Sequence, residues 1–377
     1  MANVKLGNNT LTGVSTVRLQ SADMAGEYVS FAEGSGGVPG GYDVTFSASG
    51  AVYSVVSIEA GGAISEPVAP QVSGIVTGWT TDEAGQNLVA FPYTPTASIT
   101  LYAKISAAST TLNDNSWETI SAISAAGTGA NYWSIGDAKT ITLSGTVGAV
   151  SLNADYNVYI IGFNHNSDKE GTGISFGGFE TTDATHKQLC LVDGSYNTTT
   201  SSATAFTMNT SDTNSGGWKN CHMRKAILGS TDVANGDATN AAVTNPASGT
   251  LMAVLPSDLR AVMKPITKYT NNAGNSSAAS AITPTVDYLP LLSEYEVFKT
   301  HTYANSNEDT YQAQYQYYAS GKSKVKYRHN AVSSTAHWWL RSPYASYSYG
   351  FCRVYTDGTI GTSGATNSYG VAPAFLV

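Results

Sequence analysis

The 377-residue sequence is short of charge, and this shortage excludes several classes of protein. Only 12% of its residues are charged, about half of the ~25% usual in soluble globular proteins, and 19 Lys and Arg stand against 27 Asp and Glu. Proteins that bind nucleic acid by neutralising phosphates need a basic surface, so this class is not expected. No apolar run approaches the ~18–20 residues that cross a bilayer. The first residues also lack the apolar stretch of a signal peptide, so ordinary Sec export of the chain as written is not expected.

Cysteine and histidine are equally sparse. The three cysteines, Cys190, Cys221 and Cys352, are widely spaced and form no C-x-x-C pair, which argues against both a zinc site and a disulfide framework. The six histidines form no H-E-x-x-H motif and no pair at metal-ligand spacing. We therefore expect three reduced thiols and no metal centre.

Further motifs of known chemistry are missing. Residues 164–170 offer oxygen ligands but lack the glycine and the bidentate glutamate of a calcium loop, so a solvated loop is expected there. The sequence has no G-x-S-x-G, no P-loop and no dinucleotide fingerprint after a strand. The carboxylates of a hydrolase dyad need not be neighbours in sequence, and no particular pair is indicated. No cofactor is expected.

Small polar residues and tyrosine take the place of the charges. The chain has 37 Gly and 23 Tyr besides abundant Ser, Thr and Ala, a composition that favours a β-rich, turn-rich protein with an uncharged surface. Its length predicts two or three domains. Residues 1–41 read as short strands, with Val4, Leu6, Val17 and Leu19 at alternating positions, and are interpreted as a β-rich attachment segment.

Residues 42–105 predict a small β module. Alternating strands are expected over 42–46, 52–58 and 99–103, with Gly and Pro between them. The motifs GWTTD (78–82), FP (91–92) and TASITLYA (96–103), with Gly85, resemble the internalin B-repeat, also called the Listeria–Bacteroides repeat. The resemblance implies a β-grasp-like unit of surface proteins, present here as a single copy and hence as a spacer.

Residues 106–377 mix helices and strands. A helix capped by Ser116 is expected to end at Gly127, and strands are expected over 140–143 and 156–161. Apolar spacing predicts further helices over 255–266 and 308–319, and Pro265 is expected to kink or end the first of them. In the C-terminal region Arg341 is interpreted as a framework residue, and Asp357 as a further charge of structural importance.

The last 35 residues differ in composition from the rest of the chain. From Pro343 to Val377 there is no Lys, Glu, Gln, Met, His or Trp, whereas tyrosines alternate with Ser, Gly and Thr. Tyrosine gives a large, rigid contact area at low entropic cost, as in antibody paratopes. Four or five such side chains, each burying ~150–250 Å², suffice for the ~800 Å² that each partner contributes to a standard interface.

Five segments together resemble a family of gut bacteria and their phages, the variable proteins of diversity-generating retroelements. They are GGWKNCHMR (216–224), LPSDLR (255–260), LLSEYEVF (291–298), WWLRSP (338–343) and GVAPAF (370–375). The resemblance implies an α+β chain whose residues 106–377 form a C-type lectin fold of the formylglycine-generating-enzyme type. It also implies a variable region at about 338–377.

In such systems a reverse transcriptase rewrites Asn codons of the form AAY, which can become Tyr, Ser, Gly, Thr, Ala, Arg, Ile or Asn but never Lys, Glu, Gln, Met or Trp. The missing residue types fit this rule, with Phe351, Cys352, Val354 and Gly358 as scaffold. The resemblance places ligand-binding, diversified positions at Tyr344, Ser346, Tyr347, Tyr349, Gly350, Arg353, Tyr355, Gly361, Thr362, Ser363, Gly364, Thr366, Asn367 and Tyr369.

Two departures limit what the resemblance implies. The Glu-Pro-Asn and Trp-Asn-Asp motifs of animal lectins are missing, so calcium-mediated sugar binding is not implied. Formylglycine-generating enzymes use a pair of cysteines near the C-terminus, and only Cys352 lies in that region.

The sequence thus predicts a non-enzymatic, ligand-binding display protein, encoded by a phage or prophage. It would stand on a virion or a bacterial cell surface and bind an unknown protein or glycan of a target cell, besides any contact with virion proteins. Aromatic burial would drive binding, because the face offers only Arg353 and Asp357 as charges. Two alternatives stay open: a lectin-fold oxidase or glycan hydrolase, and a purely structural tail or adhesin subunit.

Overall fold

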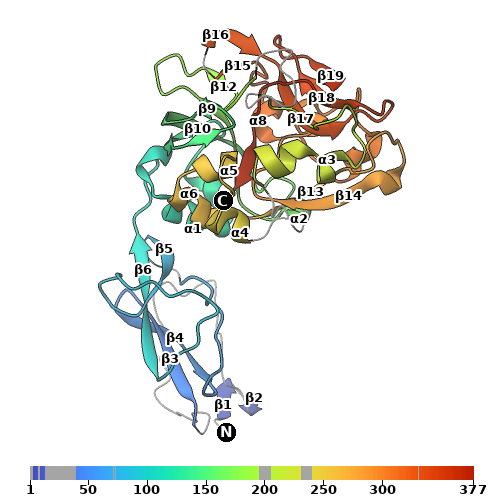
Figure 1. Ribbon diagram of the computed structural model, residues 1–377. Coiled ribbons are helices and arrows are strands. Elements are labelled where there is room, and N and C mark those ends of the chain that lie inside the picture. The colour runs from blue at the N-terminus through green and yellow to red at the C-terminus, as the bar shows by residue number, and fades with distance from the viewer. Residues whose placement is uncertain are drawn as a thin grey trace. The chain divides into compact units, whose positions relative to one another are not determined.

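The structure is a computed structural model (Figure 1) that describes residues 3–6, 9–12, 40–70, 72, 74–194, 205–230, 240–329 and 331–377. The chain divides into two compact units, residues 1–107 and 108–377. All described helices lie in the second unit, and strands hold more of the described residues than α-helices do in both units, which confirms the mixed α+β class and the β-rich N-terminal part. None of the helices in these ranges has the length and apolar character that a membrane span requires.

A four-stranded sheet forms the N-terminal unit. Its strands are β3 (Tyr42–Ala48), β4 (Ala51–Ile58), β5 (Ile75–Thr80) and β6 (Ile99–Ser106), in the order β4-β3-β6-β5. Alternation along β3 turns Val44 and Phe46 inward, and the Phe46 ring packs edge-on against Trp79 at 4.8 Å. The three strands expected in this module are confirmed, whereas β5 was not predicted as a strand.

A separate hairpin precedes this sheet. It pairs β1 (Asn3–Leu6) with β2 (Asn9–Thr12) in antiparallel fashion. Val4 and Leu6 therefore lie on a strand as expected, while Val17 and Leu19 lie outside the described residues.

The main sheet of the C-terminal unit has seven strands. They are β7 (Ala138–Leu143), β10 (Ala154–Phe163), β11 (Ile174–Glu180), β12 (Gln188–Leu189), β15 (Lys326–Arg328), β16 (Ala331–Ala336) and β20 (Ala374–Leu376). The order is β16-β15-β12-β11-β10-β7, and β20 pairs with β11. Strands β7 and β10 confirm the two strands expected near 140 and 156.

Helices and short hairpins surround this sheet (Figure 1). The α-helices are α1 (Trp117–Ala125), α2 (Ser167–Glu170), α3 (Gly217–Asn220), α4 (Asn240–Thr244), α5 (Leu251–Val254), α6 (Ser257–Val262), α7 (Glu294–Phe298) and α8 (Gln316–Ala319). Single-turn elements are η1 (Leu112–Asp114), η2 (Gly129–Asn131), the π-helical η3 (Met223–Ile227), η4 (Ala279–Ala281) and η5 (Ser306–Thr310). Two hairpins pair β8 (Thr146–Val147) with β9 (Val150–Ser151) and β13 (Ile266–Asn271) with β14 (Ile282–Asp287).

The first helix forms as its sequence predicts. The hydroxyl of Ser116 accepts a hydrogen bond from the backbone N–H of Thr119 at 3.1 Å, and Gly127 follows the helix with a φ of +68°. On the buried face of α1, the Trp117 ring packs edge-on against Phe176 of β11 at 5.2 Å and Phe375 of β20 at 6.1 Å. The helix therefore covers the pair formed by β11 and β20.

Two predicted helices are much shorter than expected. The segment 255–266 is helical only in α6, which ends at Val262, and β13 begins at Ile266. The helix thus ends before Pro265, the residue expected to kink or end it. The segment 308–319 is broken into η5 and α8. Its tyrosines make contacts in different directions: Tyr311 stacks on Tyr269 at 4.7 Å, whereas the Tyr315 hydroxyl meets Lys268. Tertiary contacts, and not one helix face, explain their spacing.

One hydrophobic core cluster of the unit joins β10 to the C-terminal strands. Tyr159 and Ile161 of β10 belong to one buried cluster with Trp338, Leu340 and Cys352. Gly178 makes room for this packing: its φ is +85°, and a Cβ there would lie 1.9 Å from the Tyr159 hydroxyl. The cluster fixes the strands that carry the predicted variable positions.

Candidate functional site

The predicted variable region forms a three-stranded antiparallel sheet. Strand β17 (Trp338–Pro343) is buried along its whole length, and it pairs with β18 (Gly350–Val354), which pairs in turn with β19 (Ile360–Gly364). Figure 1 shows these strands together at the red end of the chain. Residues 344–349 connect β17 with β18, and residues 365–373 lead from β19 to β20.

The structure gives the fourteen predicted positions three kinds of environment. Ser346, Tyr347, Tyr349 and Asn367 are exposed; Tyr344, Arg353, Tyr355, Thr362, Ser363, Gly364 and Thr366 are half-buried; Gly350, Gly361 and Tyr369 are buried. Of the four scaffold residues, Phe351, Cys352 and Val354 are fully buried and Gly358 is half-buried. The exposed positions cluster in the 344–349 segment, which we call the tyrosine loop.

Three tyrosines of this loop contact one another. Tyr347 and Tyr349 are 48% and 45% exposed, and their ring centroids lie 5.8 Å apart. The Tyr347 ring lies 4.8 Å from that of Tyr344, which meets Tyr303 edge-on at 5.3 Å. Tyr303 lies outside the predicted variable region and was missed by the sequence analysis. The four rings form a continuous aromatic surface.

The buried side chain of Asn214 holds the backbone of the tyrosine loop. Its Nδ2 donates to the carbonyl oxygens of Tyr344, Tyr347 and Gly350 at 3.0, 2.7 and 2.9 Å. Its backbone N–H donates to the carbonyl of Ser348 at 2.7 Å. Asn214 has no exposed surface, and all four bonds go to main-chain oxygens. The loop conformation is therefore fixed from outside the loop and through groups that every residue type possesses.

A second group of predicted positions surrounds Arg353. Its Cζ lies 4.5 Å from the ring centroids of both Tyr355 and Tyr369, and its Nε donates to the Thr362 carbonyl at 3.2 Å. A Cβ at Gly361 would lie 2.0 Å from Cε2 of Tyr355, so the Tyr355 ring rests directly on the Gly361 backbone. The guanidinium is therefore held in one orientation by two aromatic rings.

Cys352 has the environment of a structural thiol. It is fully buried, and its Sγ lies 3.5 Å from Oε2 of Glu294. Burial and the Glu294 carboxylate hold its pKa well above the ordinary value, which opposes formation of a reactive thiolate. The Glu294 carboxylate also accepts hydrogen bonds from the backbone N–H groups of Thr302, Tyr303 and Ala304. It thereby orders the segment that presents Tyr303.

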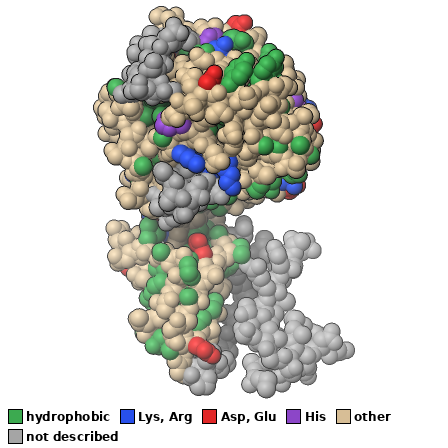
Figure 2. All heavy atoms as spheres, turned by 45° about the vertical axis from the view of Figure 1, so that its right-hand side comes forward, with side chains coloured by type: hydrophobic (Ala, Val, Ile, Leu, Met, Phe, Trp, Pro, Cys, Tyr) green, Lys and Arg blue, Asp and Glu red, His purple; other side chains and the backbone are tan. Residues whose placement is uncertain are grey.

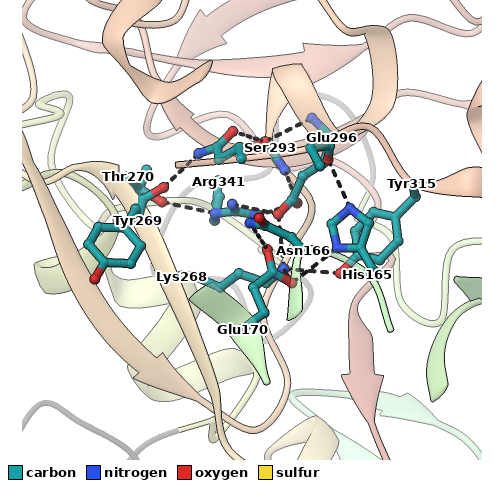
Figure 3. A network of polar contacts seen from close by, with 12 residues as sticks. His165, Asn166, Glu170, Lys268, Tyr269, Thr270, Ser293, Glu296, Tyr315 and Arg341 are labelled. Atoms are coloured by element: carbon teal, nitrogen blue, oxygen red, sulfur yellow. Dashed lines mark hydrogen bonds and ion pairs between the residues drawn. The ribbon is translucent and has the colours of Figure 1, made fainter. Parts of the chain in front are cut away.

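Arg341 of β17 belongs to a buried ionic network (Figure 3). Lys268 Nζ contacts Glu170 Oε2 at 2.6 Å, Glu296 Oε1 at 2.9 Å and the Tyr315 hydroxyl at 3.0 Å. Arg341 forms a two-pronged pair with Glu296, with Nη2 and Oε1 2.8 Å apart. All three amine protons of Lys268 are thus used within the protein, and none is left for a ligand.

The charged groups of the network stabilise one another's ionised forms. Burial alone would raise the pKa of Glu296, but Arg341 and Lys268 outweigh it and lower that pKa below the ordinary value. Burial likewise opposes the charge of Lys268, yet Glu170 and Glu296 raise its pKa. Glu308 differs: burial raises its pKa to about 7, although its carboxylate accepts hydrogen bonds from Asn271 and Ser342.

The segment 164–170 was predicted as a solvated loop, and that prediction is wrong for two of its residues. His165 and Glu170 are buried, and the two side chains lie 3.2 Å apart. The His165 ring stacks on Tyr315 at 3.6 Å, and Asn166 donates to Glu170 and to the Tyr311 carbonyl. His165, Asn166 and Glu170 of this segment therefore belong to the ionic network. Arg341 is a hydrogen-bonded framework residue, whereas Asp357 is exposed and bonded to Thr359.

Few local sequence patterns predict the ionic network or the role of Asn214 in holding the tyrosine loop. The S-x-x-E pattern at Ser293 and Glu296 is a capping-box signature, and the structure shows both of its hydrogen bonds at the start of α7. This pattern could have placed Glu296 at a helix start but not in an ion pair. Asn214 carries no local signal, because its partners lie 130 to 136 residues further along the chain.

Comparison with known proteins identifies two regions. The family of the Listeria–Bacteroides repeat matches residues 42–104, which confirms that part of the predicted resemblance. A domain of unknown function (DUF6273) matches residues 197–377, a stretch that includes Asn214, the tyrosine loop and β17–β20. No curated protein matches the chain, and no solved structure matches it. The chain therefore contains a Listeria–Bacteroides repeat domain followed by a DUF6273 domain.

Proposed function

We propose that this protein is a ligand-binding display protein whose C-terminal unit has a C-type lectin fold and is diversified by a retroelement at the fourteen positions named above. It has no catalytic role, is encoded by a phage or prophage, and stands on a virion or a bacterial cell surface. The repeat domain acts as its spacer. The ligand is a protein or glycan of a target cell.

The observation that carries the proposal is the tyrosine loop. Tyr347 and Tyr349 are exposed, neighbouring aromatic side chains on a loop whose backbone is anchored by a buried asparagine. Exposed aromatic clusters on a rigid framework are typical of binding surfaces. The anchor bonds only main-chain oxygens, so it does not restrict side chains at the diversified positions.

The surroundings of the loop support recognition without strong charge. Figure 2 shows few acidic or basic side chains on the visible surface of the C-terminal unit. Within the tyrosine loop the residues besides tyrosine are serine and alanine. Aromatic burial and neutral hydrogen bonds therefore dominate the contacts available to a partner.

Sequence variation in the gene tests the diversification directly. Among alleles from independent isolates, we expect substitutions to concentrate at the fourteen positions, with pyrimidine-ending codons there and invariant codons at Phe351, Cys352 and Val354. An upstream reverse-transcriptase gene and an adenine-rich near-copy of the 3′ end should accompany the gene. Purine-ending codons at many of these positions, such as AGA at Arg353, would contradict the proposal.

Binding to cells tests the role of the loop. Fluorescently labelled protein is incubated with a panel of gut bacterial isolates, and bound fluorescence is measured by flow cytometry. On an isolate that is bound, the Tyr347→Ser, Tyr349→Ser double variant should weaken binding by about 2 kcal/mol or more, roughly thirtyfold in Kd. Val332→Ser, which removes an exposed apolar side chain outside the loop, is the control. Equal binding by the double variant would place the ligand site elsewhere.

A further inference from the structure

Arg353 differs from the buried arginines Arg224 and Arg341 in how many of its guanidinium nitrogens have a hydrogen-bond acceptor within the protein. In Arg224 and Arg341 every guanidinium nitrogen donates to a protein acceptor, including the carboxylates of Asp287 and Glu296. For Arg353 only Nε does so. Within the described ranges, neither Nη atom of Arg353 has an acceptor at hydrogen-bonding distance. Within the described part of the chain, four N–H groups of a half-buried cation therefore remain for a ligand.

The geometry around Arg353 reduces the entropic cost of hydrogen bonding a ligand through these N–H groups. A free arginine loses rotamer entropy when it binds a ligand, whereas this one is already held against the rings of Tyr355 and Tyr369 and by the Thr362 carbonyl. The ring contacts leave the edge of the guanidinium plane as its hydrogen-bonding side. Two parallel N–H groups on such an edge match the two oxygens of a carboxylate.

The neighbouring ionisable groups form no ion pair with Arg353 in the described part of the chain. The His337 ring packs edge-on against both Tyr355 and Tyr369. Burial and the charges of Arg353 and Arg328 lower its pKa to about 4, while Asp357 acts in the opposite direction. His337 is therefore neutral at pH 7. The Asp357 carboxylate accepts hydrogen bonds from the N–H and hydroxyl of Thr359, and among the described residues it forms no ion pair with Arg353.

We propose that the outward edge of Arg353 is a carboxylate-binding subsite, so that the ligand of this allele presents a carboxylate beside the apolar surface that meets the tyrosine loop. The carboxylate can belong to an acidic side chain or to an acidic sugar. This inference rests on the proposed function only in assigning the face to ligand binding. Because Arg353 is a predicted diversified position, the preference for an acidic group belongs to this allele and not to the scaffold.

Titration of the intact protein with small carboxylates tests the subsite. The probe is acetate, and the readout is the arginine Nε–Hε signal of Arg353 in proton–nitrogen correlation spectra, with chloride at equal ionic strength as reference. We expect a saturable shift with acetate and none with chloride. Arg353→Asn removes the reporting signal, so acetate binding to this variant is followed through the backbone amide signals of Thr362 and Ser363. We expect the Kd for acetate to rise at least tenfold in this variant.

Variants separate the guanidinium geometry from its charge. Arg353→Lys keeps the charge but not the two-pronged edge, and Tyr355→Ser removes one of the two rings; both should weaken acetate binding several-fold. Lys169→Asn removes an exposed cation elsewhere and should change nothing. N-acetylaspartate amide and glucuronate then distinguish the two sources of the carboxylate by which binds more tightly than acetate.

Three outcomes would overturn the subsite: equal shifts with chloride, unchanged acetate affinity in Arg353→Asn, or unchanged affinity in Arg353→Lys together with Tyr355→Ser. Thermal unfolding of each variant shows whether the fold is intact. Acetate binding without variation among alleles would reject the diversification but keep the subsite. Variation among alleles without acetate binding would support the diversification and reject the subsite.

Discussion

Replacing Glu296 with alanine is expected to lower the free energy of unfolding of the C-terminal unit by about 3–5 kcal/mol, the usual cost of removing one member of a buried ion pair. Glu296 has no exposed surface and is shared by Lys268 and Arg341. Among the described residues, its loss leaves Arg341 without a paired carboxylate and Lys268 paired with Glu170 alone. Urea unfolding followed by far-UV circular dichroism measures the change.

A matched control and the pH profile sharpen this test. Asp168→Ala removes an exposed carboxylate of the same unit and should cost less than about 0.5 kcal/mol. Because the pKa of Glu296 is lower in the folded protein than in the unfolded chain, its stabilisation is complete above its ordinary pKa and is lost as the pH falls below that value. The acid limb of the stability profile should therefore flatten in Glu296→Ala. A loss of less than about 1 kcal/mol at neutral pH would show that the network contributes little.

The tyrosine loop should lose its fixed backbone when Asn214 is replaced by alanine. The variant removes the amide donor to three carbonyl oxygens, and we expect a loss of about 2–3 kcal/mol in unfolding free energy. Hydrogen exchange should also accelerate in the loop, most clearly at the amide of Tyr344, which donates to the Gly350 carbonyl at 2.9 Å. Mass spectrometry after timed deuteration measures this change.

Two further variants make the result for Asn214 specific. Asn214→Asp places a carboxylate against the same three carbonyls and should destabilise the unit more than alanine does. Asn367→Ala removes an exposed amide of the same face, which bonds Ser363 and Gly364, and should leave exchange in the loop unchanged. Equal exchange in the loop of Asn214→Ala and of the unaltered protein would mean that the loop is held by other contacts.

The sequence predicts those parts of the fold that depend on residues close to one another along the chain. Alternation over 42–46 and 99–103 predicts β3 and β6, because one face of a half-buried strand is read directly from neighbouring residues. The Ser116 cap likewise predicts the start of α1. Both signals lie within a few residues of the structure that they predict.

The ionic network and the loop anchor depend on distant residues. Glu170 and Lys268 are 98 residues apart, and Glu296 and Arg341 are 45 apart. In the sequence, Glu170 stands among polar neighbours, and nothing local distinguishes it from a solvated carboxylate. The false helix over 308–319 has the same cause, since the spacing of its tyrosines reflects separate tertiary contacts to Tyr269 and Lys268.

The position of β20 at the end of the chain has a consequence for gene products that are frameshifted or interrupted before it. This strand follows all fourteen predicted variable positions and pairs with β11 in the main sheet, where Phe375 packs on Trp117 and stacks on Phe176. A product that is frameshifted or interrupted between residues 344 and 369 lacks β20 and leaves the edge of β11 and these aromatic rings uncovered. Such a chain is a substrate for proteases, whereas substitutions that keep the reading frame also keep the sheet. Under the proposed diversification, only products that keep the reading frame through residues 344–369 would complete the main sheet with β20.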